Sequence, residues 1–143
     1  MNNTNVIYCY VKRDTQEVVY VGQTVNLKTR RLKHEKYDPF NPNCKEYYYP
    51  LSRGIRKYGA DYYECKILEE VSKSEDLDAR ERYWIQYYNT YLDNTKYNLT
   101  PGGSPRQYKF TYFSDNIIQL AIDLIKNTTI PFQEISEITG ISM

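Results

Sequence analysis

The sequence is poor in residues that form disulfides or bind structural metals. Its 143 residues include three cysteines and one histidine. Cys9, Cys44 and Cys65 form no CxxC pair, and an odd count fits no disulfide framework. With so few thiol and imidazole ligands, the sequence argues against a structural zinc site. This cysteine usage is typical of a reducing compartment, so we expect a cytoplasmic protein.

Long apolar runs are also missing. No stretch is long or apolar enough to span a bilayer, and the polar residues 1–5 lack the apolar core of a signal peptide. We therefore expect no membrane partner. A chain of this length predicts one domain with an appendage, and it is long enough to bury a core.

The chain has almost no net charge, but its charges are unevenly distributed. Net charge is +1, whereas residues 12–58 hold eleven Lys and Arg against five acidic residues, or +6. The remainder of the chain carries −5. Such polarity favours a face that meets an anion such as nucleic acid. An ordinary solvated surface is the alternative.

Hydrophobic and turn patterns predict an α+β fold. We expect a three-stranded, mainly antiparallel sheet flanked by helices, with a short C-terminal helical tail. The expected strands are 5–12, 17–23 (ended by Gly22) and 62–69. The expected helices are 27–36, 51–58, 75–88 after a capping box at Ser72–Glu75, 115–127 after a cap at Ser114, and 132–139. Residues 37–50 hold three prolines and predict a loop.

One carboxylate stands on an apolar helix face. Glu81 shares the face of Leu77, Trp84 and Tyr88 in the helix 75–88. A carboxylate among large apolar side chains is costly unless it is paired or binds a metal. Glu81 is therefore a candidate Mg²⁺ ligand, because Mg²⁺ prefers oxygen donors. A salt bridge to a neighbouring Arg or Lys is the alternative.

A second cluster combines a guanidinium with the lone imidazole. Arg30 and His34 are i, i+4 neighbours on the first helix, among further basic residues. Arginine can hold a phosphate and stabilise charge that develops on it, and histidine can carry a proton. A solvated basic face with an incidental histidine is the alternative. Five other basic residues are candidate DNA-backbone contacts or solvated charge: Arg31, Lys33, Arg53, Arg56 and Lys57.

Five short motifs then occur in order. They are "VIY" at 6–8, "YVG" at 20–22, "NLKTRRLKH" at 26–34, "RERYWIQYYNT" at 80–90 and "YNLTPGG" at 97–103. Together they resemble the GIY-YIG nuclease family, especially its phage and intron homing endonucleases. In that resemblance Arg30 matches the catalytic arginine, Glu81 the glutamate and Asn98 the asparagine of the family. The sequence departs at Val6, where the family has a glycine that supplies no functional group.

The resemblance implies how the candidate residues would act. Tyr8 would be the general base that activates water, and Tyr20 would hydrogen-bond the water or the phosphate. Arg30 would stabilise the pentavalent phosphate. A phenol with a pKa of about 10 is a poor base at neutral pH. Tyr8 therefore needs a partner for its proton, either His34 or a metal-bound hydroxide.

The remaining carried-over residues would hold the metal and brace the site. Glu81 would bind one Mg²⁺ or Mn²⁺ ion, since only one acidic residue is carried over at the metal. Gly22 and Asn98 would give structural support.

The resemblance further implies a metal-dependent endonuclease that hydrolyses double-stranded DNA in the cytoplasm of a bacterial or phage-infected cell. A homing enzyme is favoured. A restriction or repair nuclease and an inactive nucleic-acid-binding module stay open, as does the choice between a monomer and a transient dimer.

The domain plan follows from these motifs. A nuclease domain is expected over 1–103, a linker over 104–113 and a helical tail over 114–143. The stretch "PFQEISEITGIS" at 131–142 resembles the first helix and turn of a helix-turn-helix. A recognition helix would follow Gly140, so either the sequence is truncated or the tail has another use, such as packing on the nuclease domain.

Overall fold

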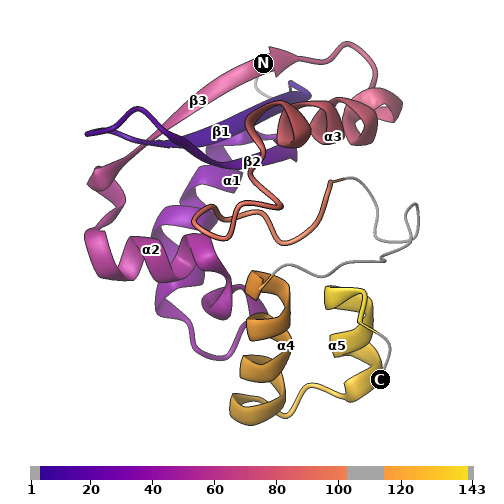
Figure 1. Ribbon diagram of the computed structural model, residues 1–143. Coiled ribbons are helices and arrows are strands. Elements are labelled where there is room, and N and C mark those ends of the chain that lie inside the picture. Colours follow the sequence, from indigo (N-terminus) through magenta and orange to yellow (C-terminus); the bar gives the residue numbers. More distant parts are fainter. Residues whose placement is uncertain (1–3, 103–114, 142–143) are drawn as a thin grey trace.

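The computed structural model describes residues 4–102 and 115–141. The predicted linker at 104–113 and the predicted helix cap at Ser114 lie outside these residues. The elements are, in order, β1 (Val6–Lys12), β2 (Val18–Thr24), α1 (Leu27–Leu32), η1 (Lys33–Tyr37), η2 (Asp38–Phe40), η3 (Lys45–Tyr48), α2 (Pro50–Tyr58), η4 (Ala60–Tyr62), β3 (Tyr63–Glu70), η5 (Ser74–Asp76), α3 (Leu77–Tyr88), α4 (Asp115–Asn127) and α5 (Phe132–Thr139) (Figure 1).

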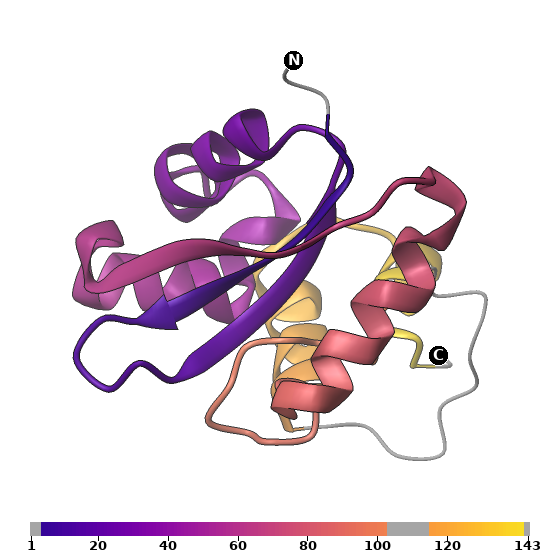
Figure 2. The same ribbon diagram turned by 90° about the horizontal axis from the view of Figure 1, so that it is seen from above.

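The three strands form one antiparallel sheet in the order β2-β1-β3. The predicted α+β class and antiparallel sheet are confirmed. Helix α3 covers one face of the sheet, and α1 and α2 lie on the other (Figure 2). The central strand β1 is therefore buried on both faces, which explains why its sequence is almost continuously apolar or aromatic.

Alternate residues of β1 belong to two separate cores. Ile7 and Cys9 pack with Leu77 and Ile85 of α3. Tyr8 and Tyr10, on the opposite face, pack with Leu51 and Ile55 of α2. The aromatic side chains of β1 thus all point toward α1 and α2, and this face carries the candidate tyrosines.

Val6 lies at the start of β1, where the family has glycine. It pairs with Thr24 of β2 and Glu70 of β3, and its side chain is 2% exposed. Valine at this position is accommodated as an ordinary buried strand residue.

Four details of the predicted elements are wrong. Gly22 does not end the second strand, since β2 continues to Thr24. The first helix becomes a π-helical segment, η1, after Leu32. The predicted loop 37–50 contains η2 and η3, and Pro50 starts α2, because proline is compatible with the first turn of a helix. The capping box at Ser72–Glu75 is replaced by η5, and within the described part of the chain the N-cap residue of α3, Asp76, makes no side-chain capping hydrogen bond.

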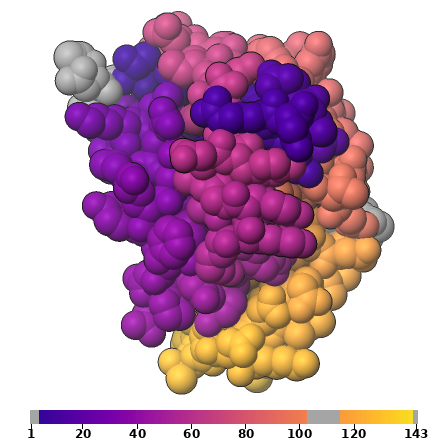
Figure 3. Space-filling model, turned by 90° about the vertical axis from the view of Figure 1, so that its left-hand side faces the viewer, coloured from indigo at the N-terminus to yellow at the C-terminus, as the bar shows by residue number. Residues whose placement is uncertain are grey.

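The C-terminal helices α4 and α5 pack against each other and against the sheet-containing part. Leu120, Leu124 and Ile135 form their shared core, to which Tyr48 and Tyr49 contribute from η3 and the residue after it. An Arg53–Asp123 ion pair of 3.2 Å joins α2 to α4. In the space-filling view the tail, orange to yellow, lies directly against the purple and magenta surface (Figure 3).

Candidate active site

A cavity of about 260 Å³ lies beside the edge strand β2. Four of the candidate catalytic residues line it, and each comes from a different element. They are Tyr20 of β2, Arg30 of α1, His34 of η1 and Glu81 of α3. The cavity therefore brings together a phenol, a guanidinium, an imidazole and a carboxylate that are up to sixty-one residues apart in the chain.

Tyr8, the fifth candidate, lies behind the cavity wall. Its side chain is fully buried, and its Oη is 2.7 Å from Nε2 of His34. The Tyr8 ring also packs against Tyr20, with ring centroids 6.3 Å apart. Tyr8 is thus connected to the cavity through His34 rather than being exposed to it.

Burial sets the protonation of this cluster. Burial raises the pKa of Tyr8 well above 10 and that of Tyr20 to about 12. Burial, reinforced by the positive charges of Arg30 and Lys33, lowers the pKa of His34 to about 3. At neutral pH both phenols carry their protons and the imidazole is neutral, so the donor in the Tyr8–His34 hydrogen bond depends on the imidazole tautomer.

Gly22 makes room for the tip of Tyr8. The two residues face each other across β1 and β2. A Cβ atom at Gly22 would lie 2.5 Å from both Cζ and Oη of Tyr8. This close approach requires a residue without a side chain, so Gly22 is needed where it stands. The strand end, which the sequence analysis gave as its role, is not the reason.

Asn98 braces the outer edge of β2. Its Nδ2 donates to the carbonyl of Val21 and its Oδ1 accepts from the amide of Val21, both at 2.8 Å. Tyr97 adds a backbone hydrogen bond to the carbonyl of Val19. The Asn98 amide therefore satisfies backbone groups that an edge strand would otherwise leave unpaired.

Glu81 is half-buried on the cavity wall and is held from β2. Its Oε1 accepts from Nε2 of Gln23 at 3.1 Å, and the same nitrogen donates to Oδ1 of Asp78 at 2.7 Å. The Glu81 carboxylate, which lines the cavity, provides hard oxygen donors of the kind that Mg²⁺ or Mn²⁺ takes, and together with water it fits a divalent ion. Sequence reasoning missed Gln23 and Asp78. The signal was the alternation along β2, which places Gln23 on the α3 face with Val21.

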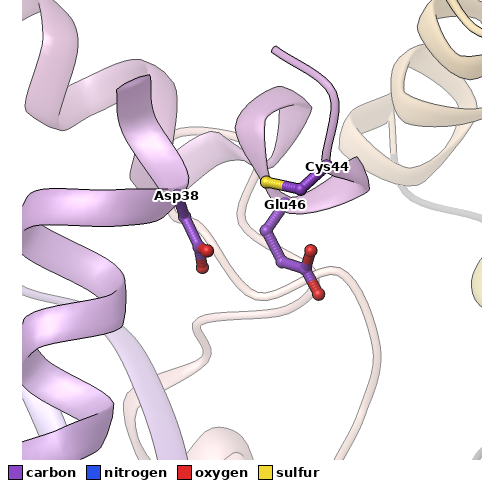
Figure 4. Close-up of side chains that lie close together, drawn as sticks. All are labelled: Asp38, Cys44 and Glu46. Carbon is purple, nitrogen blue, oxygen red and sulfur yellow. The ribbon is translucent and has the colours of Figure 1, made fainter. Parts of the chain in front are cut away.

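A second acidic group lies on another part of the cavity wall. The ligand atoms of Asp38, Cys44 and Glu46 are within 4.8 Å of one another, and Figure 4 shows the three side chains. Nζ of Lys33 is 3.1 Å from Asp38 and 3.6 Å from Glu46. The Lys33 ammonium already supplies a cation to this group.

Several predicted DNA-binding residues have partners within the protein. Arg31 pairs with Glu35 at 2.9 Å. Arg53 pairs with Asp123, as described above. Arg56 donates to the carbonyls of Pro39 and Tyr47 and lies 3.7 Å from the centroid of the Tyr47 ring. Arg53 and Arg56 are therefore bound within the protein, and their contacts join α2 to its neighbours.

Comparison with known proteins shows which family this chain belongs to. The family model described as the GIY-YIG catalytic domain matches residues 5–98. The chain belongs to the GIY-YIG family. Membership implies endonuclease activity, and the nucleases of this family are metal-dependent.

Two solved structures extend the match. The catalytic domain of the homing endonuclease I-TevI is 26% identical, with a TM-score of 0.51 over 67% of this chain and 98% of that one. A mutant of the I-TevI catalytic domain is 25% identical, with a TM-score of 0.53 over 70% and 97% of the two chains. None of the curated proteins matches this GIY-YIG chain in sequence. Among the residues described, no helix has the length and apolar character needed to cross a bilayer.

Proposed function

We propose that this GIY-YIG protein is a metal-dependent endonuclease that hydrolyses phosphodiester bonds of double-stranded DNA. The observation that carries the proposal is the convergence of Tyr20, Arg30, His34 and Glu81 on one cavity, with Tyr8 hydrogen-bonded behind them. A phosphodiester needs a cation for its developing charge, a base for the attacking water and a Lewis acid for the leaving oxygen. The cavity offers Arg30 as the cation, the Tyr8–His34 pair as the base and Glu81 as a ligand that would hold a Lewis-acidic metal ion.

The Tyr8–His34 pair would serve as the base. The Tyr8 hydroxyl is too deeply buried to lose its proton to solvent, and burial disfavours the free phenolate. Neutral His34 lines the cavity, and its Nε2 is 2.7 Å from the Tyr8 oxygen. As water adds to phosphorus, its proton would pass to the free nitrogen of the imidazole, and the Tyr8 oxygen would accept a hydrogen bond from the imidazolium, so no tyrosinate forms.

Tyr20 and Arg30 would handle the phosphate. Both line the cavity, and the Arg30 guanidinium is close enough to Tyr8 and His34 to influence the pKa of each. Arg30 would stabilise the charge that builds on the phosphate oxygens. The Tyr20 hydroxyl, which stays protonated at neutral pH, would donate a hydrogen bond to the phosphate or the attacking water.

Glu81 would hold one divalent ion, Mg²⁺ or Mn²⁺. When bound, that ion would supply positive charge to the phosphate and the leaving 3′ oxygen. Gly22 and Asn98 would keep β2 at the position that Tyr20 and Tyr8 require. Arg31, Lys33 and Lys57 remain proposed contacts to the DNA backbone.

A homing role is the favoured biological setting. It is supported by the similarity to the I-TevI catalytic domain and by the helical tail. The competing candidates are a restriction or repair nuclease and an inactive DNA-binding module, for which Val6 is the only sequence feature.

Cleavage of supercoiled plasmid tests the proposal. The parent protein should nick or linearise the plasmid in the presence of Mg²⁺ or Mn²⁺. Cleavage should stop when EDTA is added. Glu81→Ala and Arg30→Ala should lose cleavage while keeping DNA binding in gel-shift assays. Glu75→Ala and Lys28→Ala change exposed residues of the same charges and should cut normally. Wild-type cleavage by either site variant would refute the assignment, and binding without cleavage under any divalent ion would favour the inactive module.

A further inference from the structure

Gln23 occupies a position between the sheet and the proposed metal ligand. It follows Gly22 on β2, and its side chain lies on the face that α3 covers, in phase with the buried Val21. Most side chains on this face are apolar and pack into the core with Leu77 and Ile85. A half-buried amide at the end of such a face needs polar partners, and α3 provides two.

The two hydrogens of the Gln23 amide group match two carboxylates. Nε2 donates to Oδ1 of Asp78 at 2.7 Å and to Oε1 of Glu81 at 3.1 Å. Asp78 and Glu81 are i, i+3 neighbours, so α3 places both on the side that faces β2. Two adjacent carboxylates repel each other, and a shared neutral donor offsets this repulsion without adding a charge that would compete with a metal ion.

Helix α3 is also held from β3. Glu69 of β3 accepts hydrogen bonds from Nε of Arg80 at 2.8 Å and from Nε1 of Trp84 at 2.9 Å. These contacts fix the rotation of the helix about its own axis. The contact with Gln23 is one of those that orient the flexible Glu81 side chain.

We propose that Gln23 is the positioning residue for Glu81 and that Asp78 acts by anchoring Gln23. Gln23 holds Oε1 of Glu81, whose side chain lines the cavity. Asp78 takes the second amide hydrogen and prevents the Gln23 side chain from rotating away. The inference rests on the proposed function, because it assumes that Glu81 binds the metal. Loss of a hydrogen bond to a metal ligand typically weakens metal affinity about 10–100-fold.

A titration of the full chain with Mn²⁺ alone tests the inference without relying on cleavage. Electron paramagnetic resonance measures the bound and free metal. Gln23→Met keeps the length of the side chain but removes both donors. It should raise the Kd for Mn²⁺ about 10–100-fold, and excess metal should restore most of the kcat for plasmid cleavage. Gln86→Met makes the same change on an exposed glutamine of α3 and should bind Mn²⁺ like the parent. Melting temperatures without metal should agree among these variants, which separates positioning from a folding defect.

Asp78→Ala tests the anchoring step. It should weaken Mn²⁺ binding in the parent, but it should change the Kd less than about twofold in the Gln23→Met background, because Asp78 acts through Gln23. An equal loss in both backgrounds would show that Asp78 acts on the ion directly and would overturn its assigned role.

Glu81→Ala distinguishes failure of the inference from failure of the proposed function. If Glu81→Ala binds Mn²⁺ as tightly as the parent, or the parent binds none, Glu81 is not the metal ligand and the proposed metal site fails. If Glu81→Ala abolishes binding while Gln23→Met leaves the Kd unchanged, the metal site stands and the positioning role of Gln23 is refuted.

Discussion

Substituting alanine for Gly22 would place a methyl carbon 2.5 Å from both Cζ and Oη of Tyr8. Carbon atoms pack favourably at about 3.5–4.0 Å, so the ring tip would have to withdraw by about 1 Å. The Tyr8 side chain is fully buried among Tyr10, Tyr20 and His34, at ring-centroid distances of 6.2, 6.3 and 5.8 Å. Because these side chains surround the ring, the clash is expected to persist in the folded protein.

Overpacking of this kind costs about 1–3 kcal/mol of unfolding free energy. Gly22 is not among the described glycines with positive φ. Without the clash, alanine should therefore stabilise the chain by about 0.4–1 kcal/mol, because the unfolded state loses entropy. Activity should suffer more than stability. A shift of about 1 Å breaks the hydrogen bond between Tyr8 and His34, and such a displacement can lower a rate about 100-fold.

Denaturant unfolding and plasmid cleavage would measure both effects. Tyr8→Leu removes the ring tip and provides the matched background. There, Gly22→Ala should cost less than about 0.5 kcal/mol, since the Cζ and Oη atoms that clash with the methyl group are gone. If Gly22→Ala lowers the unfolding free energy equally in the parent and in the Tyr8→Leu background, the close approach to Tyr8 is not the reason for the glycine.

Three further predictions concern the support and charge of the site. Asn98→Ala leaves both backbone groups of Val21 unpaired and should cost about 2–4 kcal/mol in urea unfolding, with Asn98→Asp intermediate. Burial above all lowers the pKa of His34 from 6.5 to about 3. Protonation therefore favours the unfolded chain, and stability should fall as pH drops from about 6.5 toward 3. In a pH series of thermal melts, His34→Gln should flatten the dependence of the melting temperature on pH in this range. An unchanged dependence would refute the assignment of this pH effect to His34. Arg56→Ala should lower the melting temperature without changing the salt dependence of DNA binding, whereas Lys57→Ala should reduce that salt slope by about 1 and leave the melting temperature unchanged.

Local patterns were sufficient for most of the fold. Runs of Val, Ile and Tyr predicted the three strands to within one residue at either end, and helical spacing predicted the pair Arg30 and His34. The helices of the tail appear where their apolar periodicity placed them. Errors arose where a local signal has two meanings. Proline both interrupts and starts helices, and glycine both ends strands and allows close contacts.

The positively charged residues show the limit of composition. The excess of basic residues in 12–58 predicted an anion-binding face, yet Arg53 has its partner Asp123 on a helix seventy residues away. Arg56 is bound to two carbonyl oxygens. A charge count cannot anticipate such pairs, because the partner depends on which segments the fold brings together.

The sequence by itself determined which chemical groups the site contains and on which elements they lie. Spacing along one helix or strand is local information, so Arg30 beside His34 and Glu81 beside Trp84 follow from the order of residues alone. Only the tertiary structure placed Tyr8 behind His34, Gly22 against the Tyr8 ring, and Gln23 between Asp78 and Glu81. These contacts join β1, β2, η1 and α3. They depend on strand register and on the packing of helices against both faces of the sheet, and no local spacing encodes either.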